Sequence, residues 1–104
     1  MGLPIMEGRA TWYGHPYIGR DTASGTVYTG QEMTCAVADR KLLGATLLVA
    51  TSNRHIMVEV TDTGDATAFA KYGVAVDLSV KAFQQLARLE VGALPARVWR
   101  VKCR

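Results

Sequence analysis

Short runs of alternating apolar and polar residues dominate the chain, a pattern typical of β-strands. Residues 55–62, HIMVEVTD, place three apolar side chains on one face at period two. Residues 45–52, ATLLVATS, are more continuously apolar, and the tight turn at residues 52–54 joins the two segments into a predicted hairpin. By the same alternation Asp62 is expected to face the interior, which is an unusual place for a carboxyl group.

The remaining elements are short and broken by turns. The pattern predicts one helix, over residues 79–90, which Ser79 caps and which ends before Gly92. Further strands are predicted at residues 8–14, 33–38, 74–77 and 96–104, with turn-rich loops at residues 15–33 and 63–73. About six short strands and one helix near residues 79–90 predict a mainly β fold. We expect a small closed barrel, a single domain over residues 1–104 with residues 1–7 as a flexible lead-in.

The last predicted strand carries two kinds of side chain. Trp99 shares its parity with Val101 and Cys103, so we expect Trp99 in the core. The basic residues of the opposite parity are then expected on the surface. A solvated edge strand explains this basic stripe as well as polyanion binding does.

Composition restricts the classes of partner. The 104 residues are 49% hydrophobic and 20% charged, a globular composition with a net charge of +3. That mild positive charge suits an anionic surface such as a cell-wall polymer, whereas no dense basic run indicates nucleic acid. No apolar run approaches the roughly 20 residues that cross a bilayer, and residues 1–10 do not form a signal peptide. The chain is therefore either cytoplasmic or begins after a removed signal.

Cysteines and histidines do not form a metal motif. Cys35 and Cys103 are far from metal-ligand spacing with His15 and His55, so we expect no metal and no cofactor. Two free buried thiols and one disulfide both remain open for the cysteine pair.

Four ordered motifs resemble one known family. GRATWYG, IGRDTASGTVY, VEVTDTGD and VAVDLS are similar to the double-psi β-barrel domain of the rare lipoprotein A family, and the expansins share that barrel. The resemblance covers about residues 8–102. It implies a six-stranded double-psi β-barrel with a polysaccharide groove, in a secreted, periplasmic or cell-wall protein. The implied partner is a cell-wall glycan such as peptidoglycan, and we expect a monomer.

The resemblance also suggests site residues. Asp62 matches the aspartate regarded as the general acid/base, and Thr11 and Asp77 match two polar positions of the expansin groove. Candidate substrate-binding residues are, in addition, an aromatic pair for stacking on sugar rings and two hydroxyl donors: Trp12, Tyr13, Thr22 and Ser24. The alternative for each is structural: turn capping for Asp62, interaction with a helix N-terminus for Asp77, core packing for the aromatic residues and turn stabilisation for the hydroxyls.

Two departures from the family pattern widen the range of functions. The family histidine is replaced near Ala38 or Asp39, and the family's Asp-Arg-Gly-Pro is here DTGD, residues 62–65. Gly64 also stands where bacterial expansins have a tyrosine. Three functions follow as hypotheses: a lytic transglycosylase, which needs one carboxyl group because the sugar's own 6-hydroxyl replaces water; a non-catalytic, expansin-like polysaccharide-binding module; and a secreted protein-interaction or inhibitor barrel.

Overall fold

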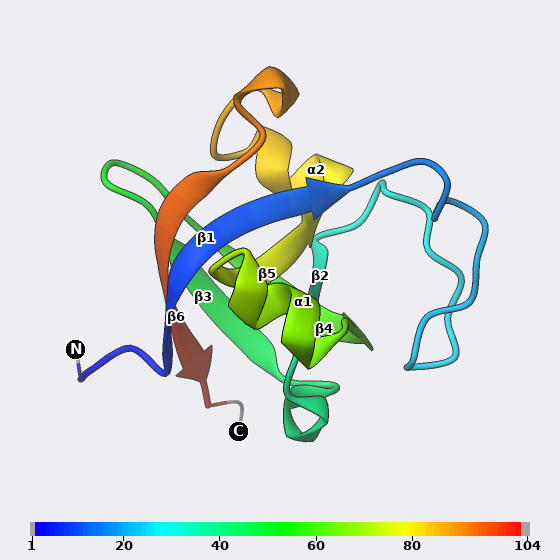
Figure 1. Ribbon diagram of the computed structural model, residues 1–104, viewed down its shortest axis with the longest axis horizontal. Coiled ribbons are helices and arrows are strands. Elements are labelled where there is room, and N and C mark those ends of the chain that lie inside the picture. Colours follow the sequence, from blue (N-terminus) through cyan, green and yellow to red (C-terminus); the bar gives the residue numbers. More distant parts are fainter. Residues whose placement is uncertain (1, 103–104) are drawn as a thin grey trace.

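Six strands close into one barrel in the computed structural model, which describes residues 2–102. The barrel order is β1-β5-β2-β4-β3-β6 (Figure 1). The pairs β1–β5 and β2–β4 are parallel and the other four are antiparallel. The strands are β1 (Met6–Tyr13), β2 (Thr34–Val37), β3 (Thr46–Ala50), β4 (His55–Thr63), β5 (Val74–Ser79) and β6 (Leu94–Val101). This closed mixed barrel confirms the mainly β, six-stranded double-psi expectation.

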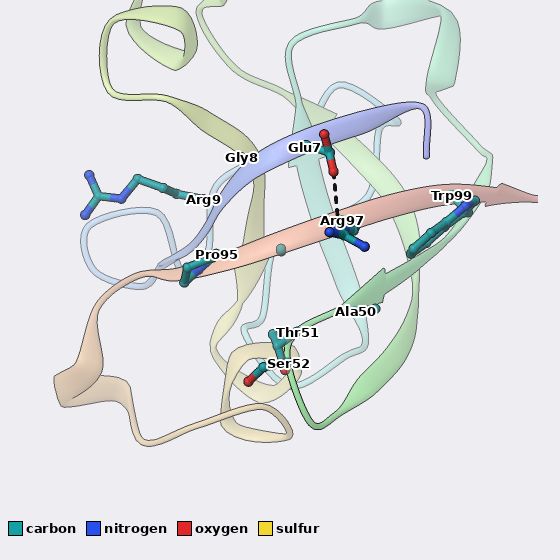
Figure 2. A pocket seen from close by; sticks show the side chains of 10 residues that line it. Glu7, Gly8, Arg9, Ala50, Thr51, Ser52, Pro95, Arg97 and Trp99 are labelled. Atoms are coloured by element: carbon teal, nitrogen blue, oxygen red, sulfur yellow. Dashed lines mark ion pairs between the residues drawn. The ribbon is translucent and has the colours of Figure 1, made fainter. Parts of the chain in front are cut away.

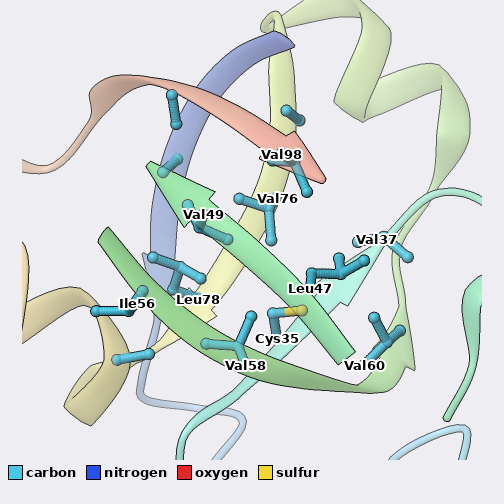
Figure 3. Close-up of a cluster of buried hydrophobic side chains, with 14 of the residues drawn as sticks. Cys35, Val37, Leu47, Val49, Ile56, Val58, Val60, Val76, Leu78 and Val98 are labelled. Atoms are coloured by element: carbon cyan, nitrogen blue, oxygen red, sulfur yellow. The ribbon is translucent and has the colours of Figure 1, made fainter. Parts of the chain in front are cut away.

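The barrel is filled mainly by branched aliphatic side chains from β2 to β6, as Figure 3 shows, and β1 contributes Ala10. The predicted hairpin is confirmed, and Leu47 and Val49 of β3 meet Val58 and Val60 of β4 in the core. Cys35 lies fully buried among them. Burial raises the pKa of its thiol, so the group is an inert core residue. Its proposed partner, Cys103, lies outside the described residues.

The helices differ from the single helix predicted. Ser79 does cap α2 (Val80–Gln84), accepting a 3.1 Å hydrogen bond from the Ala82 amide, but α2 stops at Gln84. The prediction that this helix extends to residue 90 is therefore wrong. Arg88 is extended, with ψ of 147°, and a 3₁₀ turn, η2 (Leu89–Val91), follows it. The apolar stripe misled because Phe83 and Leu86 are both buried in the barrel core although the helix ends between them, at Gln84.

A second helix occupies a segment predicted as loop. The helix α1 (Ala66–Lys71) begins at Asp65, whose Oδ1 accepts from the Thr67 amide at 2.9 Å. No residue of α1 is buried, so the apolar pattern gave no signal for it. A further 3₁₀ turn, η1 (Arg40–Leu42), is capped by Asp39.

Both terminal strands depart from expectation. β1 begins at Met6, two residues earlier than predicted, and Ile5 already pairs with β6 through a 2.8 Å bond from its amide to the Val98 carbonyl. In β6 the parity prediction is wrong. Val98 fills the core, and Trp99 lies on the outer face, where its indole N–H donates to the Gly2 carbonyl at 2.8 Å.

Candidate functional site

A row of paired residues crosses the outer surface of four neighbouring strands. Thr11 of β1 is in register with Asp77 of β5, Asp77 with Ala36 of β2, and Ala36 with Asp62 of β4. Because strands in a sheet lie about 4.8 Å apart, the two aspartates are roughly 10 Å apart at their Cα atoms. We call these four residues the aspartate row. Three site residues from distant parts of the sequence thus lie on one line.

A β-bulge places Asp62 in that row. Cys35 pairs with Val60, yet the next residue, Ala36, pairs with Asp62, so Thr61 is the extra residue of β4. The bulge shifts the alternation by one position and turns Asp62 from the core face to the outer face. The expectation that Asp62 faces the interior is therefore wrong. The reason is a backbone irregularity that period-two reasoning does not detect.

Asp77 is the carboxyl group with the most perturbed environment in the row. It is partly buried, and removal from water raises its pKa from the ordinary 3.8 to about 6. The Thr11 hydroxyl donates a 2.8 Å hydrogen bond to Asp77 Oδ1, which favours the ionised form and partly offsets that rise. Asp77 therefore changes protonation in the mildly acidic range, as an acid/base group must.

Asp62 is held by backbone donors. Its Oδ1 accepts from the Thr63 amide at 2.9 Å and from the Ala23 amide at 3.0 Å. The second bond fastens the long β1–β2 connection to the end of β4, and the Ser24 amide reinforces it by donating to the Thr61 carbonyl at 2.9 Å. The turn-capping alternative for Asp62 is thus real, but it engages one carboxylate oxygen.

Two stacked tyrosines cover the middle of the row. The rings of Tyr13 and Tyr28 lie 4.3 Å apart at their centroids with an 18° interplanar angle, and both pack on Ala36. The Tyr28 hydroxyl donates to the Tyr13 carbonyl and accepts from the Val80 amide at 3.2 Å. The Tyr13 hydroxyl is buried and has no hydrogen-bond partner among residues 2–102. Burial first, then the nearby Tyr28, Asp62 and Asp77, raise the pKa of Tyr13.

The other predicted binding residues are divided between the two sides of the sheet. Trp12 lies on the core side of β1 and donates from its indole N–H to the Leu89 carbonyl at 3.0 Å, away from the row. Thr22 and Ser24 lie beside the row, in the β1–β2 connection. Their hydroxyls are 2.9 Å apart, and Thr22 donates to the Thr26 carbonyl at 2.8 Å.

Sequence reasoning missed three contributors to the site. Tyr28 stood in a turn-rich segment without periodicity, and Ala36 carries no chemistry of its own. Arg40, from η1, contacts Thr63 with 3.4 Å between Nη1 and Oγ1. Arg40 therefore places a cation beside Thr63, the position that corresponds to the arginine of the family's Asp-Arg-Gly-Pro motif.

The structure also explains the glycine at the expansin tyrosine position. The ring of Phe69, from α1, lies against Gly64, and a Cβ built on Gly64 would be 2.3 Å from a ring carbon of Phe69. A larger residue at position 64 would therefore require the Phe69 ring to move.

A separate and larger hollow lies on the other half of the barrel. It measures about 700 Å³ and is bounded by β1, β6 and the turn after β3, with the ion pair of Glu7 and Arg97 (3.1 Å) across it (Figure 2). Trp99 lines its far edge. It shares no residue with the aspartate row and contains no predicted site residue. The aspartate row, which carries two carboxyl groups, is therefore the candidate site.

Neither a metal site nor a membrane helix is found in the described part of the chain. Residues 2–102 hold no group of three metal-ligating side chains. None of the helices between those residues has the length and apolar character needed to cross a bilayer.

Comparison with known proteins places this geometry in a family. The family model described as "Lytic transglycolase" matches residues 5–98, nearly the whole chain. The chain belongs to the lytic transglycolase family. Uncharacterized protein ssl3177 of Synechocystis sp. is 30% identical to it over 99 residues, which is 93% of this chain and 100% of the relative.

Solved structures share the barrel of this lytic transglycolase family member. The Streptomyces papain inhibitor superposes with a TM-score of 0.70 at 25% identity, covering 97% of this chain and 100% of the inhibitor. Expansin of Clavibacter michiganensis matches in its apo form (TM-score 0.72, 23% identity, 95% of this chain). An aspartate-to-asparagine mutant of it in complex with cellohexaose also matches (0.71, 22%, 93%). This chain spans about half the length of the expansins, so those likenesses concern the fold of one part.

Proposed function

We propose that this protein binds a cell-wall glycan strand along the aspartate row and cleaves it lytically, with Asp77 and Asp62 as the two proton-handling groups. The observation that carries the proposal is the register that aligns Thr11, Asp77, Ala36 and Asp62 on one face of the sheet. Membership of the lytic transglycolase family supports the reaction class. The proposed setting is the cell wall or periplasm, and the proposed working form is a monomer.

The reaction assigns one role to each carboxyl group. Asp77 in its protonated form donates to the glycosidic oxygen, and the bond between that oxygen and the anomeric carbon breaks. The 6-hydroxyl oxygen of the same sugar then bonds to the anomeric carbon, and its proton passes to ionised Asp62. The products are a 1,6-anhydro end and a new hydroxyl end, with no water consumed.

This assignment differs from the one based on resemblance, in which Asp62 alone gives and takes the proton. The environment of Asp77, with a pKa raised to about 6 by burial, suits it to hold the proton near neutrality. Asp62 stays the carboxylate that receives a proton and stabilises the positive charge developing on the sugar. Thr11 orients Asp77, and the Tyr13–Tyr28 stack shapes the floor between them.

Two other functions have specific support. The likeness to an expansin solved with cellohexaose, together with the absent family histidine, favours a module that grips glycan without cutting it. The likeness to the papain inhibitor over its full length favours an inhibitor barrel. Co-sedimentation with purified sacculi separates these possibilities when the supernatant is examined for products and the protein is assayed against papain.

The outcomes are distinct. Wall binding with 1,6-anhydro products that disappear in Asp77→Asn and Asp62→Asn supports the enzyme. Wall binding by all three proteins without products would replace the enzyme by the binding module. Papain inhibition without wall binding would exclude both glycan functions.

A further inference from the structure

A second hollow borders the aspartate row on the outer face of β2 and β4. It measures about 280 Å³, and six of its ten lining residues carry hydroxyl groups on threonine or serine. Drug-sized ligands occupy about 300–1,000 Å³, so this hollow suits one sugar unit. Its lining residues are Thr22, Ser24, Thr26, Val27, Tyr28, Thr29, Glu32, Thr34, Glu59 and Thr61. We call it the hydroxyl hollow.

The hydroxyl hollow adjoins the proposed site. Thr61, the bulge residue, lines it and is followed directly by Asp62. The connection that carries Thr22 and Ser24 is fastened to Asp62 through the Ala23 amide, 3.0 Å from Oδ1. A glycan on the row would therefore extend into the hollow with its next sugar unit.

Two carboxylates distinguish the hollow from a neutral sugar site. Glu32 and Glu59 both line it, and their backbones are adjacent because the Glu59 amide donates to the Met33 carbonyl at 3.0 Å. Neither carboxylate forms an ion pair within residues 2–102. In a chain of net charge +3, these unpaired carboxylates make a local anionic site.

The hydroxyl groups that line the hollow supply the remaining acceptors, from Thr22 and Thr61, which are buried residues, and from Ser24 and Thr26, which are exposed. The Thr61 side chain is only 8% exposed and lines the hollow, and its hydroxyl has no hydrogen bond to any residue in the described part of the chain. The hydroxyls of Thr22, Ser24 and Thr26 lie 2.9 to 3.1 Å from one another. Since each hydroxyl donates one proton and carries two lone pairs, this group has acceptors to spare.

We propose that the hydroxyl hollow binds the protonated 2-amino group of a glucosamine unit, so that the substrate is a partly de-N-acetylated glycan. An ammonium group brings three donors and one positive charge, which match the spare hydroxyl acceptors and the two unpaired carboxylates. An N-acetyl group would present one amide donor, no charge and added bulk. The inference rests on the proposed glycan function and names the substrate class of that site.

The test compares two hexasaccharides that differ in N-acetylation. Calorimetric titration at low ionic strength measures the affinity for glucosamine hexamer and for N-acetylglucosamine hexamer. We expect about tenfold tighter binding of the glucosamine hexamer, weakened by salt. In a Glu32→Gln/Glu59→Gln double variant the two affinities should become equal. Glu90→Gln, which removes one negative charge from an exposed glutamate outside the hollow, is a control and should keep the preference.

Each possible result supports or contradicts a different part of the proposal. Equal affinity of the wild type for both hexamers would overturn the amine site and leave the glycan function standing. A preference that persists in the double variant would overturn the assignment to Glu32 and Glu59. Binding that depends on the two glutamates but is unaffected by Asp62→Ala and Asp77→Asn would support the amine site. The same result would overturn the proposal that the glycan binds along the aspartate row. Absence of binding by both hexamers would overturn both proposals.

Discussion

Thr11 and Asp77, 66 residues apart in the chain, are joined by a 2.8 Å hydrogen bond across the parallel β1–β5 pair. The bond links the two neighbouring polar side chains at one end of the aspartate row, and it favours the ionised form of Asp77. The bond therefore lowers the pKa of Asp77, the group that we propose as the proton donor.

Removing the Thr11 donor should raise the pKa of Asp77 above its value of about 6, because burial then acts without the opposing bond. We expect the Asp77 titration midpoint in Thr11→Val to move to higher pH, followed by carboxyl carbon NMR. Thr67→Val, an exposed threonine of α1, is the control and should leave the midpoint in place. An unchanged midpoint in Thr11→Val would show that the bond has no influence on the proton.

Asp77 should make the free energy of unfolding fall as the pH rises. Its folded pKa of about 6 lies above the ordinary 3.8, so the folded state binds the proton more tightly. Its contribution is most favourable below about pH 4, declines between about pH 4 and 6, and costs about 2–3 kcal/mol above that window. Asp77→Asn should therefore be stabilising at pH 7.5 and near neutral at pH 4 in urea unfolding. Equal effects at both pH values would refute the linkage.

Two substitutions of Asp62 should separate its functional role from its structural role. An asparagine keeps an oxygen that accepts from the Ala23 and Thr63 amides, whereas alanine loses both bonds. We expect Asp62→Asn to unfold close to the wild type and Asp62→Ala to lose about 1–3 kcal/mol. Thermal unfolding checks this. A large loss in the asparagine variant would mean that the charge itself is structural.

The stacked tyrosines should respond oppositely to the same chemical change. Tyr13→Phe removes a buried hydroxyl that has no partner in residues 2–102, so stability should stay level or rise by about 1 kcal/mol. Tyr28→Phe removes a hydroxyl that bonds the Tyr13 carbonyl and the Val80 amide, so stability should fall by about 1–3 kcal/mol. Similar losses in both variants would contradict the hydrogen-bond assignment.

Sequence reasoning succeeded where one face was clearly apolar. The hairpin of β3 and β4 was predicted from the alternation in residues 55–62 and the tight turn at residues 52–54, and the structure pairs the two strands. It failed in β6, where Val98 and Trp99 offer apolar residues on both faces, so alternation could not choose between them. It also failed at Thr61, because a bulge adds one residue without any signal in composition.

Only part of the candidate site could be predicted from the sequence. Thr11, Asp62 and Asp77 were identified through motif resemblance, and the strand register brings them into one row. Their alignment through Ala36 depends on non-local pairing that no local pattern encodes. Alternation placed Trp12 and Tyr13 on opposite faces of the strand without deciding which faces the barrel, and the structure places Trp12 on the core side of β1.

The central claim is that the aspartate row cleaves glycan with Asp77 as the proton donor. Mass spectrometry of purified glycan strands incubated at pH 6 with wild type or Asp77→Asn tests it most directly. The account predicts 1,6-anhydro ends from the wild type and at least a hundredfold fewer from Asp77→Asn, in line with the 10²–10⁴-fold contribution of general acid–base catalysis. Anhydro ends produced equally by both proteins would contradict it.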